Sequence, residues 1–251
     1  MRIPRSPVTL ATVLVVALSG ALLIGAAVPR FTATQVRRAD DPLIRAIQRG
    51  YEIEIEYADR LPQSRLRAAG LVDRGQDYAE AALLEQYFAM AGEDGEVDRE
   101  RLIRAEGYMQ EALARAPVDP HGWARLAYMR SLLEAPADEI AAPLKMSLYL
   151  GPHEPNLTRA RLTLCLLVWE EFEIAERDLV YEQARFLWSL TGWSNPSGRQ
   201  PGHSKAEFVE LSDLPYGFPV LMFALRQDPE AVAEFETMVQ ERRERQRRDQ
   251  Q

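Results

Sequence analysis

The segment Ala112–Tyr128, ALARAPVDPHGWARLAY, decides how most of this chain folds. Ala112 is a small residue of the kind that lets two helices approach closely, and Pro117 ends the helix that contains it. Asp119 and Pro120 then start another helix, because an acidic side chain can cap its first turn and proline's missing N–H costs nothing at the first helical position. The segment therefore predicts two closely packed helices joined by a tight turn.

The spacing around this segment matches a tetratricopeptide repeat, a unit of two helices with a period of about 34 residues. The opening residues of such a unit, W-x-x-L-[G/A], are here Trp123, Leu126 and Ala127. Pro152 follows Pro117 by 35 residues, and Glu154-Pro155 offers the next start. The sequence thus predicts one good repeat, one degenerate successor and one predecessor that shares only the layout of helix pairs.

Helices are predicted along almost the whole chain. The expected segments are 42–58, 62–75, 76–91, 99–116, 120–134, 136–150, 155–171, 172–190, 216–226 and 228–247. Tyr51–Tyr57 alternates apolar and acidic residues, which is also a strand pattern, but its helical flanks favour helix. Pro143 falls inside an expected helix, so that helix should start there or bend. Convincing strand patterns are otherwise absent, which makes the predicted fold class all-α.

Residues Val8–Val28 form a 21-residue run without a charge. About 20 apolar residues suffice for a helix to cross the bilayer core. A cleaved signal peptide is the alternative, with Gly25-Ala26-Ala27 as its cleavage site. The length of the run and the following Pro29 favour an uncleaved signal anchor.

The orientation of this anchor rests on the lengths of its flanks. Only seven residues precede the run, and a large domain follows it. This arrangement favours a single-pass protein of the inner membrane whose C-terminal domain faces the periplasm. The basic residues near the two ends compete and do not decide the matter; they are Arg2 and Arg5 before the run and Arg30, Arg37 and Arg38 after it.

The predicted architecture is a short α-solenoid of tetratricopeptide-like helical pairs behind a single transmembrane helix. Its expected parts are a signal anchor at 1–30, a polar linker at 31–40, helical repeats at 41–191, a loop insertion at 192–204, and a C-terminal helical cap with a charged tail at 205–251. The loop is expected because residues 194–203, SNPSGRQPGH, are rich in turn formers.

Composition argues against several functions. The net charge of −8 and the isoelectric point near 5.1 disfavour a general nucleic-acid binder, since such domains are typically basic. Cys165 is the only cysteine and lies in an apolar stretch, so we expect a buried thiol and no intramolecular disulfide. The only histidines, His121, His153 and His203, lack metal-ligand spacing, so we expect no metal and no cofactor.

No motif predicts catalysis, and we expect no enzyme activity and no catalytic residue. The carboxylates at Glu52, Glu54 and Glu56, or at Glu170 and Glu171, could in principle act as a glycosidase pair. Solvated helix surfaces explain them better. Of the four tryptophans, Trp123, Trp169 and Trp188 are expected in the core, and Trp193 is expected to be exposed.

A partner-binding face is the more favoured kind of site. Helical repeat arrays bind partners along a concave surface lined mainly by the first helix of each pair. In the best repeat that face would offer His121, Arg125, Tyr128 and Ser131.

Several segments follow one another along the chain in a characteristic order. After the anchor and the Asp-Pro helix come Ala112–Tyr128, SLYLGPHEPNLTRARL at 147–162, ARFLW at 184–188 and ALRQDPEAVAEFETMV at 224–239. This order resembles that of bacterial accessory proteins of exopolysaccharide biosynthesis, which are small, membrane-anchored and tetratricopeptide-like. The resemblance covers most of residues 40–240 and carries no catalytic signature.

The resemblance implies a non-catalytic scaffold that binds protein partners in the assembly or export of surface polysaccharide. Two alternatives remain open at this point. One is a general adaptor or assembly factor of the cell envelope, unrelated to polysaccharide. The more distant one is an enzyme such as a glycan hydrolase.

Overall fold

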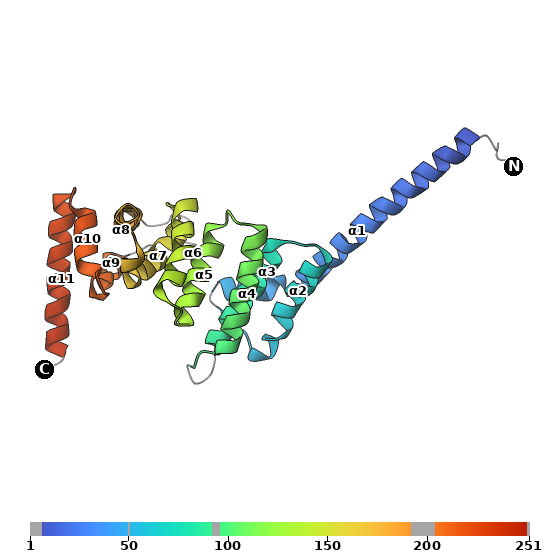
Figure 1. Cartoon of the computed structure of the whole chain (residues 1–251). Coiled ribbons are helices and arrows are strands. Elements are labelled where there is room, and N and C mark those ends of the chain that lie inside the picture. The colour runs from blue at the N-terminus through green and yellow to red at the C-terminus, as the bar shows by residue number, and fades with distance from the viewer. Residues whose placement is uncertain (1–6, 50, 92–95, 192–203, 250–251) are drawn as a thin grey trace. The chain divides into compact units, whose positions relative to one another are not determined.

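The computed structural model describes residues 7–49, 51–91, 96–191 and 204–249 (Figure 1). Throughout these ranges the regular structure is helical and no strand occurs, which confirms the all-α prediction. The α-helices are α1 Pro7–Gln48, α2 Arg60–Leu71, α3 Gly75–Met90, α4 Arg99–Arg115, α5 Pro120–Leu132, α6 Ala137–Leu150, α7 Pro155–Leu167, α8 Arg177–Leu190, α9 Lys205–Glu210, α10 Gly217–Leu225 and α11 Pro229–Asp249. Short 3-10 turns lie at Ile55–Tyr57, Trp169–Glu171 and Leu211–Asp213.

Two compact units make up the chain. Unit 1 comprises residues 1–116 and unit 2 residues 117–251. The boundary falls at Pro117, the residue expected to end a repeat. Most of the predicted loop insertion at 192–204, including Trp193 and His203, lies outside the described residues; Ser204 is the N-cap of α9.

Helix α1 runs without a break for 42 residues and contains both Pro29 and Pro42. The predicted linker at 31–40 and the predicted helix start at Asp41-Pro42 are therefore wrong. A proline inside a helix removes one backbone hydrogen bond. At Pro42 that loss is offset by packing, since α1 buries the neighbouring Asp40 and Ile44 against the rest of unit 1.

The prediction of helix beyond Gln48 is also wrong. Between α1 and α2 only Ile55–Tyr57 forms a 3-10 turn. The backbone N–H of Ile53 donates to the hydroxyl of Tyr87 on α3 at 2.9 Å, a long-range bond that an α-helix would not leave available. The alternating segment is thus held by a side chain of another helix.

In unit 1, α1 and α3 run in the same direction. Arg37 of α1 pairs with Asp77 of α3, and further along Ile44 and Ile47 share an apolar cluster with Leu84 and Phe88. Helix α2 runs in the opposite direction, because it ends just before the short turn that leads into α3. Helix α4 also opposes α3: the N–H of Asp98 at its start donates to the carbonyl of Ala89, and Arg115 at its end pairs with Asp73.

In unit 2, α5 and α6 form an antiparallel hairpin. The hydroxyl of Ser147, near the end of α6, donates to the carbonyl of Pro120 at the start of α5 at 2.7 Å. At the other end, Arg130 Nη1 donates to the carbonyl of Glu139 at 2.9 Å. This carbonyl would have bonded the N–H that Pro143 lacks. Helix α6 therefore starts at Ala137 and continues through Pro143, where a later start or a bend was expected.

The core of unit 2 extends from α5 to α11. Trp188 packs against both Phe208 and Phe235, with ring centroids 5.0 and 6.4 Å away. Trp169 is buried as predicted, whereas Trp123 and Trp188 are only half-buried. The indole N–H of Trp123 donates to the carbonyl of Pro117 at 2.8 Å, which fixes the first turn of the unit.

Helix α9 was not predicted. It begins with a capping box, in which Ser204 and Glu207 each bond the other's backbone N–H. The predicted border between α7 and α8 is also displaced: α7 ends at Leu167, and α8 starts only at Arg177. The intervening turn buries Phe172 in the core, so tertiary packing rather than helix propensity determines this border.

Candidate functional sites

The predicted partner-binding face lies on α5. His121 stands at its first turn with 47% of its side chain exposed, and its Nε2 is 3.6 Å from a carboxylate oxygen of Glu154. Arg125 follows one turn later and is half-buried. Burial lowers the pKa of its guanidinium, and within the described residues it has no hydrogen bond or ion pair. Arg125 therefore has donors to offer to a ligand.

The other two predicted residues serve the chain itself. Tyr128 packs against the core of unit 2. The hydroxyl of Ser131 donates to the carbonyl of Tyr128 at 2.7 Å. The structure thus places all four predicted residues along α5, where His121 is exposed and Arg125 has no partner among the described residues, while Tyr128 and Ser131 are partly buried.

A buried arginine supports the turn beneath this face. Arg161 of α7 is 0% exposed, and its Nη1 donates to the carbonyls of Ser147 at 3.0 Å and Gly151 at 2.7 Å. These carbonyls lie at the end of α6, where that of Ser147 also accepts the N–H of Gly151 at 3.2 Å and that of Gly151 lies beyond the last helical N–H. Gly151 is needed there, because a Cβ on it would lie 2.9 Å from the ring of Pro120. The turns before α5 and α7 are thereby joined.

An ion-pair cluster that the sequence analysis missed joins α1 to α2 and α3. Arg37 of α1 binds Asp77 of α3 through two parallel bonds, Nε–Oδ1 at 2.7 Å and Nη2–Oδ2 at 2.5 Å. Arg65 of α2 contacts Asp41 of α1 at 2.7 Å and Glu80 of α3 at 3.0 Å. Asp77 and Arg65 are each only 1% exposed. We call these five residues the anchor cluster.

No local signal marks the anchor cluster in the sequence. Its members come from three helices, and each resembles an ordinary charge on a helix surface. Only the pairing of helix faces brings them together. To find these residues from the sequence, one would have to know which positions of α1 and α3 face each other.

The anchor cluster holds three carboxylates against two guanidinium groups. Burial raises the pKa of Glu80, and the neighbouring Asp77 and Asp41 raise it further. Arg65 and a hydrogen bond from Gln76 at 2.9 Å oppose this shift. Conversely, the pKa of Arg37 is raised, chiefly by its hydrogen bonds to Asp77. The charged form of Glu80 is therefore disfavoured in the folded cluster.

Replacing Glu80 with glutamine is expected to raise the stability of unit 1 at neutral pH by up to about 1 kcal/mol. The folded-state pKa of Glu80 lies above its unfolded value, so its contribution is present in acid and is lost as the pH rises through the folded pKa. Glutamine does not titrate and avoids that loss. Urea unfolding of the full chain at about pH 4 and about pH 8 measures the difference.

The gain from Glu80→Gln should vanish at the acidic pH. Glu100→Gln, a change at an exposed carboxylate of α4, is the control and should have little effect at either pH. A destabilisation by Glu80→Gln that is equal at both pH values would contradict the prediction.

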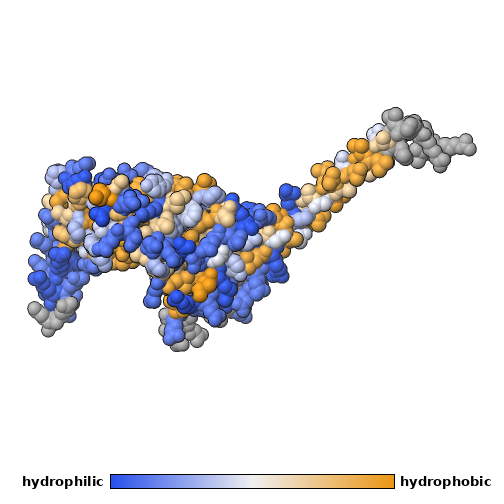
Figure 2. Space-filling view, viewed as in Figure 1, coloured by the Kyte–Doolittle hydropathy of each residue, from blue (hydrophilic) through white to orange (hydrophobic). Residues whose placement is uncertain are grey.

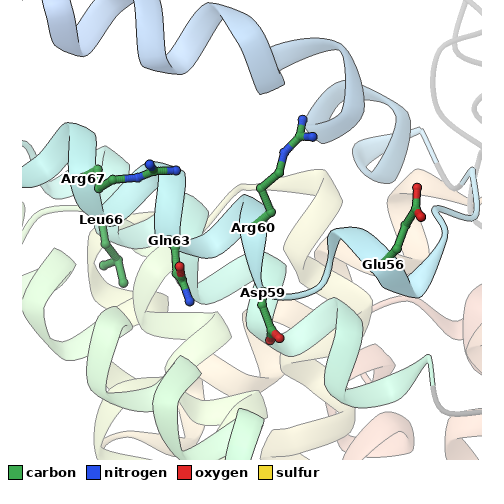
Figure 3. Close-up of a pocket in the computed structure, with 6 residues that line it drawn as sticks. All are labelled: Glu56, Asp59, Arg60, Gln63, Leu66 and Arg67. Carbon is green, nitrogen blue, oxygen red and sulfur yellow. The ribbon is translucent and has the colours of Figure 1, made fainter.

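A pocket of about 680 Å³ is lined by residues of α2 and of the turn before it. Figure 3 shows Arg60 and Arg67 on one side of this helix and Asp59 and Gln63 on the other. Asp59 already bonds Arg101 at 2.8 Å, and Arg60 bonds Asp40 at 3.1 Å. Asp59 and Arg60 are thus bound within unit 1, and the charged groups of this pocket do not converge on a common point.

The remaining candidate groups have ordinary surroundings. Cys165 is buried as predicted, and burial raises the pKa of its thiol. His153 is exposed and its ring packs edge-on against Phe186 at 5.1 Å. Glu170 accepts a hydrogen bond from the hydroxyl of Tyr216. Among the described residues, no group of three or more His, Cys, Asp or Glu side chains is arranged to hold a metal ion.

Comparison with known proteins adds no relative: no protein family, no curated protein and no solved structure matches this chain.

Proposed function

We propose that this chain is a non-catalytic scaffold, tethered to the inner membrane by α1, that binds protein partners in the assembly or export of bacterial surface polysaccharide. The observation that carries the proposal is that the two ends of α1 have different surroundings. One end of this helix is long and apolar enough to cross a membrane, and its other end is part of a helical unit.

The projecting part of α1 supports membrane insertion. Its large apolar side chains, from Val13 to Val28, are more than half exposed. Figure 2 shows this part of the helix as an almost continuous apolar surface. Exposure of that much apolar area is unfavourable in water and is expected in lipid.

The helical hairpins support a role in binding. We propose that α5–α6 and α7–α8 are tetratricopeptide-like pairs and that the α5 face is the partner-binding surface. His121 and Arg125 offer an imidazole and a guanidinium side by side on one face. Such a surface suits an acidic or polar segment of a partner protein. Tethering would raise the local concentration of that partner at the membrane.

The link to polysaccharide rests on the order of the sequence motifs. Partner identity is therefore the deciding test. A photocrosslinking residue placed at His121, in cells that make the protein, is expected to capture a specific partner that mass spectrometry can identify. The same residue placed at Asp138, an exposed position at the opposite end of the α5–α6 hairpin, is the matched control.

Each outcome of this experiment decides one part of the proposal. A component of polysaccharide polymerisation or export captured from position 121, and not from 138, supports the whole proposal. An identified envelope protein of another pathway replaces it with a general adaptor function. Equal or absent capture at the two positions excludes the α5 face as the binding surface.

A further inference from the structure

The continuity of α1 fixes how far unit 1 lies from its apolar segment. Val28 is the last residue of the uncharged run, and Ala33, which is 0% exposed, is the first residue of α1 buried by the unit. Five residues of helix span about 8 Å. The headgroup layer on each side of a bilayer is about 5–8 Å thick. Unit 1 therefore begins where the headgroup layer ends.

The parallel course of α1 and α3 decides which end of unit 1 faces the lipid. The pairing of Arg37 with Asp77 puts the start of α3 toward the projecting part of α1. The turn between α2 and α3, residues 72–74, lies at that same end, beside the point where α1 leaves the unit in Figure 1. The start of α4 lies at the opposite end, one length of α3 away, or about 24 Å.

The side chains at this end combine apolar and cationic groups. Leu71 is 41% exposed, although it ends a helix of a folded unit. Arg74 is exposed and bonds only the neutral side chain of Gln76. Arg67, one turn before Leu71, is exposed and has no partner among the described residues. The nearby carboxylate of Asp73 pairs with Arg115, which also pairs with Glu111 at 2.6 Å.

We propose that this end of unit 1 rests on the membrane surface and binds anionic phospholipid headgroups. Leu71 would enter the interface, and Arg67 and Arg74 would bind headgroup phosphates. Basic side chains close to an anionic membrane are attracted to its surface and strengthen binding. The inference rests on the proposed insertion of α1, and it adds that the unit is held against the lipid rather than hanging free from a flexible tether.

Depth-dependent quenching tests the proposal in the full chain. A fluorescent thiol label is placed at Leu71→Cys, or at Glu100→Cys as the control from the far end of the unit. A third variant, Gly25→Cys, reports on insertion of α1. The native Cys165 is buried and takes no label under native conditions. The proteins are reconstituted into vesicles of phosphatidylcholine with or without phosphatidylglycerol.

The expected result is strong quenching of the label at 71, and little at 100, by a nitroxide attached to the lipid headgroup. Quenching at 71 should increase with phosphatidylglycerol. Adding Arg67→Gln and Arg74→Gln should abolish this increase. A label at 71 that is quenched no more than the label at 100 would overturn the inference, as would an unchanged response to phosphatidylglycerol in the double arginine variant.

The variant Gly25→Cys separates failure of this inference from failure of the proposed function. If a nitroxide on the acyl chain quenches the label at 25 while the label at 71 stays unquenched, α1 is inserted and only the headgroup contact is wrong. If the label at 25 is not quenched either, α1 does not span the bilayer, and both proposals fall.

Discussion

Replacing Asp77 with alanine is expected to destabilise unit 1 by about 3–5 kcal/mol. The carboxylate of Asp77 is almost fully buried and neutralises Arg37 through two short hydrogen bonds. Without it, the guanidinium of Arg37 would remain half-buried and uncompensated between α1 and α3. Loss of a buried partner costs more than the intact pair contributes, because the remaining charge has lost both its water and its counterion.

Hydrogen exchange of the full chain in detergent is the measurement of choice, because it reports on α1 and α3 separately from unit 2. The amides of α1 beyond Ala33 and those of α3 should lose protection in the Asp77→Ala variant. The matched control is Asp73→Ala, which removes an exposed partner of Arg115 and should cost about 1 kcal/mol or less. Equal effects of the two changes would contradict a special role for Asp77.

The double variant Arg37→Met with Asp77→Leu sharpens this test. Replacing both members of a buried pair with apolar residues is often close to neutral. We therefore expect it to regain much of the protection that Asp77→Ala loses. Failure to regain any would mean that the loss comes from disturbed packing and not from the unpaired charge.

Replacing Arg161 with alanine is expected to destabilise unit 2 by about 3 kcal/mol. The side chain is fully buried and bonds two carbonyls at the end of α6. The carbonyl of Ser147 keeps the N–H of Gly151. The carbonyl of Gly151 left without a partner costs about 1–3 kcal/mol, and the missing side chain leaves a cavity. Burial lowers the pKa of Arg161, so removing its charge relieves part of this loss, but the unpaired carbonyl of Gly151 and the cavity outweigh that gain.

Hydrogen exchange of the last turn of α6 and the first turn of α5 measures this effect. The control is Arg159→Ala, on the same helix, whose half-exposed side chain pairs with Glu210 at 3.1 Å. It should cost about 1 kcal/mol or less. The variant Arg161→Met keeps most of the volume and should lose less stability than alanine. Equal losses for Arg159 and Arg161 would show that the two carbonyls do not depend on Arg161.

Local signals in the sequence predicted the helices that begin with a clear cap. Helix α5 begins at Pro120, where Asp119 was expected to cap it, and its carboxylate accepts the N–H of His121 at 3.0 Å. Local signals misled at Pro42, which lies inside α1. An acidic residue followed by proline has the same local sequence at a helix start and in a helix interior. The cost of the proline in the interior is offset only by distant packing, which the local sequence does not show.

For the candidate sites, too, the sequence predicted some features and only the structure showed others. Periodicity placed His121 and Arg125 on one side of α5, since residues four apart share a helix face. It could not show that Tyr128 and Ser131 are engaged with the chain itself, because that depends on which elements cover the face.

The sequence by itself determined the all-α class, the apolar segment of α1 and most helix borders, because these follow from composition and from interactions within a few residues. Only the tertiary structure decided that α1 continues into unit 1 and that Arg37 meets Asp77. Those features arise when helices 40 residues apart in the chain align side by side, and the energy of that alignment comes from surfaces that neither helix specifies alone.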